Sequence, residues 1–228
     1  MSYDKTKTDP KLGKKIREYL IEQGVETPVI SSMLEVDSKS KISKIEEAMT
    51  TVYETIGMDL SNDSLAETPS RIAKMLVLES FYGLQEENFP KCTTVENAMA
   101  YDEMVVEKEI TLISQCEHHQ SGVIGTATVA YIPKNKILGL SKIPRIVEYF
   151  SRRPQIQERL TAQIYHALSY ILETDAVAVV VEAKHMCVCS RGVEDTNPYT
   201  ITSKLGPPFK ADAALRAEFM SLALSRKS

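Results

Sequence analysis

Apolar side chains recur every three or four residues through most of the first 95 positions, which is the spacing of amphipathic helices. This spacing predicts a short first helix and a longer second helix over residues 42–56, joined by a polar linker at 36–41. A third helix is expected to start at Thr68, as its cap, with Pro69 in its first turn. Residues 1–95 are therefore predicted to form a helical N-terminal region.

The pattern changes after residue 95. Val and Ile become frequent and alternate with polar residues over 104–114 and again over 123–132, as they do in strands. The elements expected next, in chain order, are a helix over 143–150, a long helix that opens at Pro154, a strand from Ala176 to about Cys189, a strand over 200–203 and a helix over 211–224. The order β-β-α-α-β-β-α predicts an α+β domain over residues 96–228, in which strands flank a helix pair.

Charge and hydropathy exclude several classes of protein. Lys and Arg number 27 and Asp and Glu number 31, so the net charge is −4, unlike that of a basic protein that coats nucleic acid. No apolar run approaches the roughly 20 residues that a membrane helix requires. The polar stretch 1–15 lacks the apolar core of a secretory signal. We therefore expect a cytoplasmic protein whose partners include neither nucleic acid nor a membrane.

Two short segments hold most of the cysteine and histidine. Residues 116–119 read Cys-Glu-His-His, and residues 185–189 read His-Met-Cys-Val-Cys. Four cysteines are too few for a disulfide scaffold, and in a reducing compartment such clusters are typical of metal or catalytic sites. A tight Cys-x-x-His turn can aim both side chains at one point, and thiolate with imidazole favours Zn²⁺.

The number of ligands is left open by the spacing. On a strand, His185, Cys187 and Cys189 would all point to the same face. A catalytic zinc site has three protein ligands and an open position, whereas Cys116, His119, Cys187 and Cys189 together would make a closed structural site. A third interpretation has the cysteines in the core and the histidines on the surface.

Several charged residues are candidates for ligand binding. Lys142 and Arg145 are separated by three positions on one predicted helix face, and with Arg191 they could form an anion clamp. The alternative is a solvated charged face. Glu158, near the start of the long helix, either favours the helix dipole or accepts hydrogen bonds from a guanidine-like edge of a ligand.

Longer motifs resemble the GTP cyclohydrolase I family. They are the Cys-Glu-His-His segment with GTATVAYIP at 125–133, LAETPSRIAKM at 65–75, GLSKIPRIV at 139–147, RPQIQERLT at 153–161, and HMCV at 185–188 with Arg191-Gly192 after it. These motifs occur in the family's order and spacing, and the resemblance covers roughly residues 45–220.

The resemblance implies a tunnelling fold, an antiparallel sheet with a packed helix pair, behind the helical N-terminal region. It implies a toroidal homodecamer of two pentamers, with active sites at subunit interfaces. It also implies a zinc-dependent reaction in which GTP and water give formate and 7,8-dihydroneopterin triphosphate, the first step of tetrahydrofolate and pterin biosynthesis.

Site roles carry over from the family by motif. The implied zinc ligands are Cys116, His119 and Cys187, which leaves Cys189 outside the metal shell. The implied catalytic residues are His118 or His185 as proton donor to the guanine ring, Ser141 for the proton transfers of the ribose rearrangement, and Gln157 for positioning the base or ribose. The implied substrate-binding residues are Glu158 at the guanine N–H edge and Lys142, Arg145 and Arg191 at the triphosphate.

The chain departs from the family pattern in the run 194–199, which replaces a small, Thr-rich stretch, and in two features at the Cys/His segments. The polar run Gln120-Ser121-Gly122 follows the histidine pair where the family usually has apolar or aromatic residues, and Cys189 adds a spare thiol. The alternative hypothesis is an inactive or regulatory zinc-stabilised paralogue of the same fold, which would bind metal without consuming GTP. A nitrile reductase of the same fold uses a cysteine nucleophile and would not need this Cys/His set.

Overall fold

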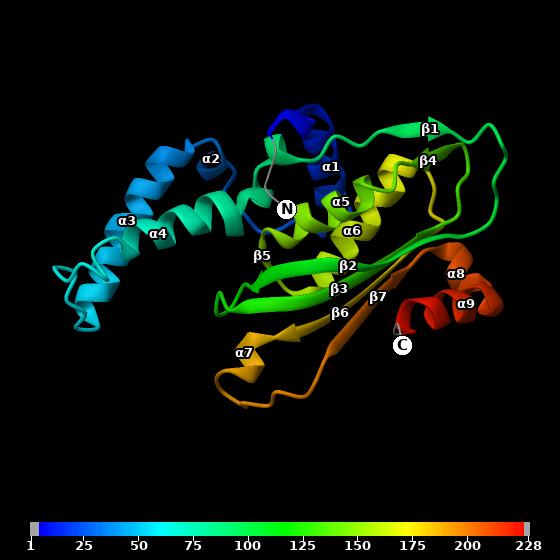
Figure 1. Cartoon of the computed structure of the whole chain (residues 1–228). Helices are drawn as coiled ribbons and strands as arrows, with labels where there is room; N and C mark the ends of the chain where they lie inside the picture. The colour runs from blue at the N-terminus through cyan, green and yellow to red at the C-terminus, as the bar shows by residue number, and fades with distance from the viewer. Residues whose placement is uncertain (1–4, 226–228) are drawn as a thin grey trace.

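The computed structural model describes residues 5–225 (Figure 1). The first part of the chain contains the helices α1 (Pro10–Glu22), α2 (Ser31–Leu34), α3 (Ser38–Thr55) and α4 (Thr68–Lys74), followed by the π-helix η2 (Met75–Ser80). Short 3-10 turns lie at η1 (Lys5–Lys7), η3 (Tyr82–Leu84) and η4 (Glu86–Asn88). Among the described residues, no helix combines the length and apolar character needed to cross a membrane.

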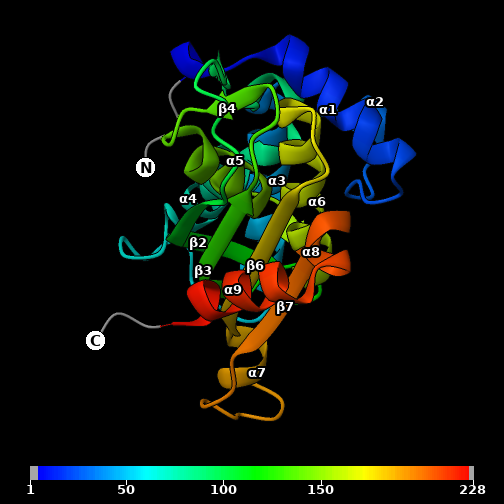
Figure 2. The ribbon, with the colours of Figure 1, turned by 90° about the vertical axis from the view of Figure 1, so that its right-hand side faces the viewer.

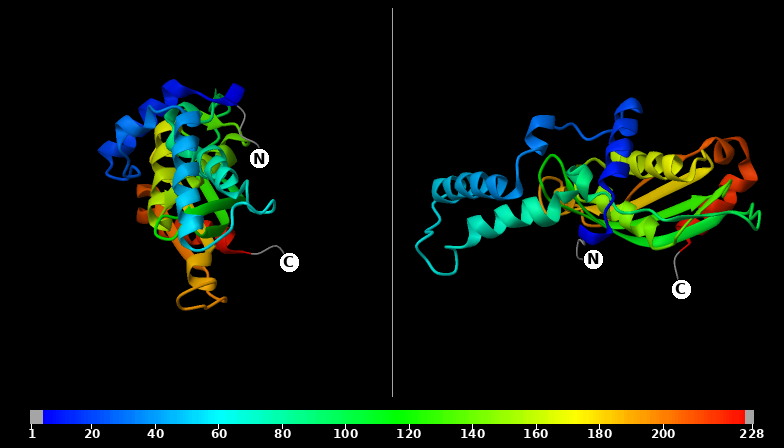
Figure 3. Two further views of the ribbon diagram at one scale, coloured as in Figure 1. Left: turned by 90° about the vertical axis from the view of Figure 1, so that its left-hand side faces the viewer. Right: turned by 90° about the horizontal axis from the view of Figure 1, so that it is seen from above.

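Helix α1 is docked on the body of the molecule, whereas α3 and α4 extend away from it. Ile16 and Leu20 on α1 are fully buried in the main core. The ring of Tyr19 lies 5.2 Å from the ring of Tyr170 on α6 (Gln157–Leu172). By contrast, α3 has no buried residue and packs mainly against α4, so this pair forms an arm beside the sheet (Figures 1 and 3).

The predicted linker at 36–41 is wrong from Ser38 onward. The carboxylate of Asp37 accepts a hydrogen bond from the backbone N–H of Ser40 at 3.0 Å, which caps α3 and starts the helix within the polar run. Thr68 is not a cap, because it is already the first residue of α4 and Glu67 takes the cap position without a side-chain bond. Pro69 lies in the first turn, as predicted.

A five-stranded sheet runs through the second part, in the order β5-β2-β3-β6-β7. Its strands are β2 (Val105–Cys116), β3 (Gly122–Tyr131), β5 (Pro154–Gln155), β6 (Val177–His185) and β7 (Thr200–Leu205). All pairs are antiparallel except β2–β5. A separate ribbon joins β1 (Thr94–Glu96) to β4 (Lys136–Leu138). The strands predicted over 104–114, 123–132 and 200–203 are confirmed within one or two residues at most ends.

Helices cover both faces of this sheet to different extents. On one face, α5 (Lys142–Ser151) and α6 pack over the main core, and α6 buries apolar residues at helical spacing, Leu160, Ile164, Leu168 and Ile171. On the other face, α8 (Pro207–Ala211) and α9 (Ala213–Leu224) bury Phe209 and Phe219 against part of the strands (Figure 2). The architecture is therefore mixed α+β, as the order of elements predicted.

Two predicted boundaries beside the Cys/His segments are wrong. Pro154 does not open the long helix, because Pro154 and Gln155 pair with the end of β2 and α6 begins at Gln157. The buried guanidinium of Arg153, which donates to the backbone oxygen of Gly83 at 2.7 Å and contacts Glu26 at 2.8 Å, holds this stretch extended.

The other wrong boundary is the end of β6. The strand stops at His185, and residues Met186–Cys189 form the single helical turn α7. The premise that His185, Cys187 and Cys189 share a strand face therefore fails. The predicted terminal helix over 211–224 is also divided, since Asp212 caps α9 by accepting from the backbone N–H groups of Ala214 and Leu215.

Candidate active site

A hydrogen-bonded turn at the end of β2 aims the first Cys/His segment. The N–H of Cys116 donates to the oxygen of Ser121, and the N–H of Gln120 donates to the oxygen of Cys116, both at 2.9 Å. Gln120 adopts a left-handed conformation with φ of 49°, which closes the turn. The N–H of Glu117 donates to the oxygen of Gln155 on β5 at 3.0 Å. Backbone bonds therefore order this loop despite its polar sequence.

The second segment meets the first because β3 and β6 are paired in register. Val123, just after the turn, lies opposite His185, and α7 then bends the chain back toward the end of β2. One ligand atom each from Cys116, His119 and Cys187 lies within 4.8 Å of the other two. Within the described part of the chain, Cys189 does not belong to this group.

The donor chemistry of this trio fits a metal ion. Two thiols and an imidazole converge on one point, with Cys116 buried, Cys187 half-buried and His119 exposed. Burial, and after it the neighbouring Cys116 thiol, raises the pKa of the Cys187 thiol. A divalent cation at this point would reverse that effect, since a coordinated thiol binds as thiolate. The trio could therefore hold a metal ion and leave a coordination position open.

His118 lies beside the trio at its exposed side. Its Nδ1 is 3.8 Å from the Cys116 Sγ, and its Nε2 is 3.8 Å from a Glu117 carboxylate oxygen. Glu117 is itself held by Arg159 on α6 at 2.6 Å. With 64% of its side chain exposed, His118 is accessible to a ligand arriving from solvent.

His185 is held by the amide of Gln157. Its Nε2 lies 2.7 Å from the Gln157 Oε1. The Gln157 Nε2 is within 3.1 Å of the backbone oxygens of Val181 and Thr200, which only accept, so the orientation of the amide is assigned by chemistry. His185 must then donate from Nε2, and its Nδ1 is left as the acceptor. Burial lowers the pKa of His185, and the charge of Glu158 partly opposes this shift.

Arg191 and Glu158 also lie at this site. The Arg191 guanidinium donates to the Nε2 of His119 at 2.9 Å. Glu158 is exposed on the first turn of α6, next to Gln157. Both residues thus lie beside the Cys/His group of their own chain.

Ser141, Lys142 and Arg145 lie elsewhere in the same chain. Lys142 starts α5, where its N–H donates to the oxygen of Gly139 at 2.8 Å, and Ser141 is exposed before it. Lys142 and Arg145 act on the thiol of Cys92, whose pKa burial raises to about 12 while these cations oppose the shift. The metal trio lies beyond the opposite end of α5, where Gln155 pairs with Cys116, and a helix of 10 residues is roughly 15 Å long.

Sequence reasoning missed two groups that support the site. Arg159, which fixes Glu117, lies in the motif at 153–161, but nothing in its spacing indicated a partner 42 residues away. The amide of Gln115 donates to the Ser80 hydroxyl at 2.9 Å and so links η2 to the residue before Cys116. These pairings are tertiary and carry no local signal.

Comparison with known proteins agrees with this geometry. The sequence profile of GTP cyclohydrolase I matches residues 45–224. GTP cyclohydrolase 1 from Shewanella sp. (strain W3-18-1) is 52% identical over 206 residues, which are 90% of this chain and 95% of that protein. The enzyme of the same name from Aeromonas hydrophila is 51% identical over 90% of this chain and 94% of its own length. GTP cyclohydrolase 1 from Actinobacillus pleuropneumoniae serotype 5b is 51% identical over 92% of this chain and 95% of its own length. The chain belongs to the GTP cyclohydrolase I family.

Proposed function

We propose that this protein is a zinc-dependent GTP cyclohydrolase I that converts GTP and water into formate and 7,8-dihydroneopterin triphosphate, the first step of tetrahydrofolate and pterin biosynthesis. The observation that carries the proposal is the convergence of Cys116, His119 and Cys187, with His118 and His185 beside them, in a chain of this family.

Cys116, His119 and Cys187 would hold the zinc. Two thiolates and one imidazole are a donor set that zinc prefers, and three protein ligands are the number found in catalytic sites. Zinc bound there would lower the pKa of a bound water to about 7 and so supply hydroxide at neutral pH for attack on C8 of guanine. Among the described residues, Cys189 does not belong to the group of converging ligand atoms, and this argues against a closed structural zinc site with four protein ligands.

The two histidines have different roles in this proposal. His118 is exposed and lies near Glu117, whose carboxylate would stabilise an imidazolium, so His118 is the donor of a proton to N7 of guanine. His185 donates from Nε2 to Gln157 and has Nδ1 free to accept, so it would hold a proton taken from the reacting water or ribose. Gln157 therefore acts as a positioning residue rather than by contact with the base.

The charged residues would bind the two ends of GTP. The exposed carboxylate of Glu158 would accept hydrogen bonds from the guanine N–H edge. Arg191, at His119, would contact the triphosphate. Fixed cations can bind this anion although the whole chain has a net charge of −4.

Lys142, Arg145 and Ser141 would act on the substrate of a neighbouring subunit. They lie at the end of α5 that points away from the trio of their own chain. A site built from two chains therefore unites the proposed residues, and it accords with a homodecamer of the tunnelling fold whose active sites lie at subunit interfaces. The division into a helical region over 1–95 and a catalytic domain over 96–228 belongs to the same proposal.

Matched cysteine variants test the metal assignment. Cys116→Ser and Cys187→Ser are expected to lose bound zinc and formate production together, whereas Cys189→Ser keeps both. Zinc per chain is measured by atomic absorption and formate by an enzymatic assay. Zinc loss in Cys189→Ser would support the closed site of an inactive or regulatory paralogue.

A further inference from the structure

The first turn of α6 contacts both Cys/His segments. On this turn, the Oε1 of Gln157 lies 2.7 Å from the Nε2 of His185, at the start of the second segment. Two positions later, Arg159 forms an ion pair with Glu117 of the first segment. The apolar side chains of α6 lie in the main core, so this turn is a firm support. One helical turn therefore holds the two segments beside each other.

The contact between Arg159 and Glu117 has two points and little exposure to solvent. The Arg159 Nη1 lies 2.6 Å from one carboxylate oxygen of Glu117, and the Nη2 lies 3.5 Å from the other. Only 15% of the Arg159 side chain and 24% of the Glu117 side chain are exposed. A planar guanidinium that meets both oxygens fixes the direction of the carboxylate as well as its distance. The backbone N–H of Glu117 also donates to the oxygen of Gln155 at 3.0 Å, so this residue is held by both its main chain and its side chain.

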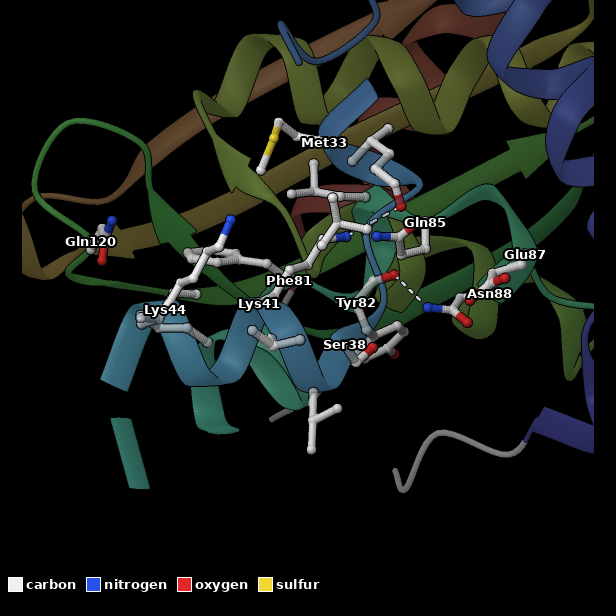
Figure 4. Close-up of a pocket in the computed structure, with 17 residues that line it drawn as sticks. Met33, Ser38, Lys41, Lys44, Phe81, Tyr82, Gln85, Glu87, Asn88 and Gln120 are labelled. Carbon is white, nitrogen blue, oxygen red and sulfur yellow. Dashed lines mark hydrogen bonds between the residues drawn. The ribbon is translucent and has the colours of Figure 1, made fainter. Parts of the chain in front are cut away.

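The other side chains of the turn 116–121, which we call the metal turn, have weaker support. His118 and His119 are exposed, and Arg191, which contacts His119, is itself exposed in the loop after α7. Gln120 lies at the edge of a groove between α3 and η2, apart from the other labelled residues there (Figure 4). Its side chain forms no hydrogen bond with any residue in the described part of the chain. The pair with Arg159 is thus the contact that ties a side chain of this turn to a helix of the core.

We propose that Arg159 is a positioning residue for the metal site, which acts through Glu117 rather than by contact with the metal. This inference rests on the proposed function, because it takes Cys116, His119 and Cys187 as the zinc ligands. Glu117 lies between the first two of these ligands in the chain, so the direction of its side chain sets the path of the turn that carries both. Residues outside the coordination shell that orient ligands typically change metal affinity by 10–100-fold.

Charge alone would have the opposite effect on zinc affinity. A guanidinium near a divalent cation repels it, so removal of the Arg159 charge would tighten zinc binding if only charge mattered. Loss of a positioning contact weakens zinc binding instead. At Glu117 the two effects have the same sign, because removal of a carboxylate also reduces the attraction for a cation. The sign of the change at Arg159 therefore separates the two explanations.

Zinc affinity is measured by competition with a chelator, on the full-length protein in its native assembly and without nucleotide. Arg159→Met keeps the apolar stem but removes the donors and the charge, and it is expected to weaken zinc binding about tenfold. Arg159→Lys keeps the charge but not the fork and should lose about threefold. Glu117→Gln should also lose about tenfold, and the double variant with Arg159→Met should bind no more weakly, because either change breaks the same contact. The control is Arg17→Met on α1, which removes a guanidinium that pairs with Glu86 at 3.5 Å and should leave zinc affinity unchanged.

Bound Co²⁺ gives a second readout, because its absorption depends on the geometry of its ligands. The spectrum should change in Arg159→Met and lie closer to that of the parent in Arg159→Lys. Equal or tighter zinc binding by Arg159→Met, in a chain whose metal-free form melts like the parent, would overturn the proposal, and so would losses that add in the double variant. If Arg159→Met melts lower, Arg159→Lys takes its place, and parental affinity in that variant refutes the proposal. The proposed function fails on a different result, zinc binding that survives Cys116→Ser, and neither outcome depends on whether GTP is consumed.

Discussion

Gln157 shows how one buried side chain sets the state of another. Two backbone oxygens fix its amide nitrogen, so its oxygen must face His185 and hold that ring with a proton on Nε2. The resemblance to the family implied roles for both residues, and it implied that Gln157 positions the base or ribose of the substrate. In the structure, the amide of Gln157 forms its hydrogen bonds with His185 and with two backbone oxygens of the same chain.

Replacing Gln157 by Leu is expected to lower kcat at least tenfold while zinc content stays at the level of the parent, because His185 loses its tautomer and orientation. Gln163→Leu is the matched control, since Gln163 is a buried amide on the same helix that bonds the backbone of Val25 and the side chain of Thr27. Similar losses of kcat in variants with equal melting temperatures would contradict the positioning role.

Arg191 and a metal ion compete for the same electron pair. A guanidinium only donates, so its contact with the Nε2 of His119 uses the lone pair of the imidazole. A coordinated imidazole gives that lone pair to the metal. Metal binding should therefore release Arg191, which would then be free to contact the triphosphate.

Arg191→Gln and Arg191→Lys are both expected to bind zinc about 3–10-fold more tightly than the parent, measured by chelator competition without nucleotide. The lysine variant retains the positive charge but not the reach of the guanidinium fork. If only the glutamine variant gains affinity, simple charge repulsion explains the effect and the competition for the lone pair is refuted.

At the scale of elements, the sequence predicted those helices and strands whose apolar residues recur at a regular spacing. The strands β2, β3 and β7 follow from the frequent Val and Ile residues and their alternation with polar ones, and the long helix α6 was predicted as an element although not at its exact start. The extended stretch at Pro154 and the turn after His185 could not be read this way, because the buried Arg153 and the pairing with Cys116 impose them from outside the segment. These two elements border the metal trio. The sequence therefore named the candidate residues, but it did not predict the backbone structure that brings them together.

The contact between α1 and α6 should make stability depend on pH. His166 on α6 lies 6.1 Å from the Tyr19 ring, and burial, followed by the charge of Lys204, lowers its pKa below 6.5. Below pH 6.5 the unfolded chain therefore binds more protons than the folded one, and stability falls until the pH reaches the lowered pKa. The contribution is fully present above pH 6.5.

We expect the melting temperature of His166→Gln, measured by circular dichroism, to fall less than that of the parent when the pH is lowered from 7.5 to 5.5. The difference between the two proteins isolates His166, because His185, whose pKa is also lowered, remains in both. An equal or larger loss in the variant would show that His166 is not the titrating group.

At the scale of the whole molecule, one chain does not complete the proposed site. The metal trio lies at the end of β2 and the cations Lys142 and Arg145 lie at the far end of α5. The family resemblance predicted the residues and their joint use, but their separation within a subunit is a property of the fold that no motif encodes.

Mixed assemblies test this separation. Lys142→Ala and His119→Ala are each expected to be inactive alone, and a co-refolded 1:1 mixture should recover about a quarter of parental activity, because that fraction of composite sites combines two intact halves. Refolded mixtures of His119→Ala with Cys116→Ser, which damage the same half, are the control and should stay inactive. Absence of recovery, in mixtures shown to contain both chains, would contradict a shared site.

The most direct measurement of the proposed reaction is formate release from GTP by the purified protein, with the pterin absorbance followed in parallel and bound zinc quantified. The account predicts one formate for each GTP consumed, a matching rise of the pterin signal, and loss of both when a chelator removes the zinc. Zinc bound at one ion per chain with GTP left intact would contradict it.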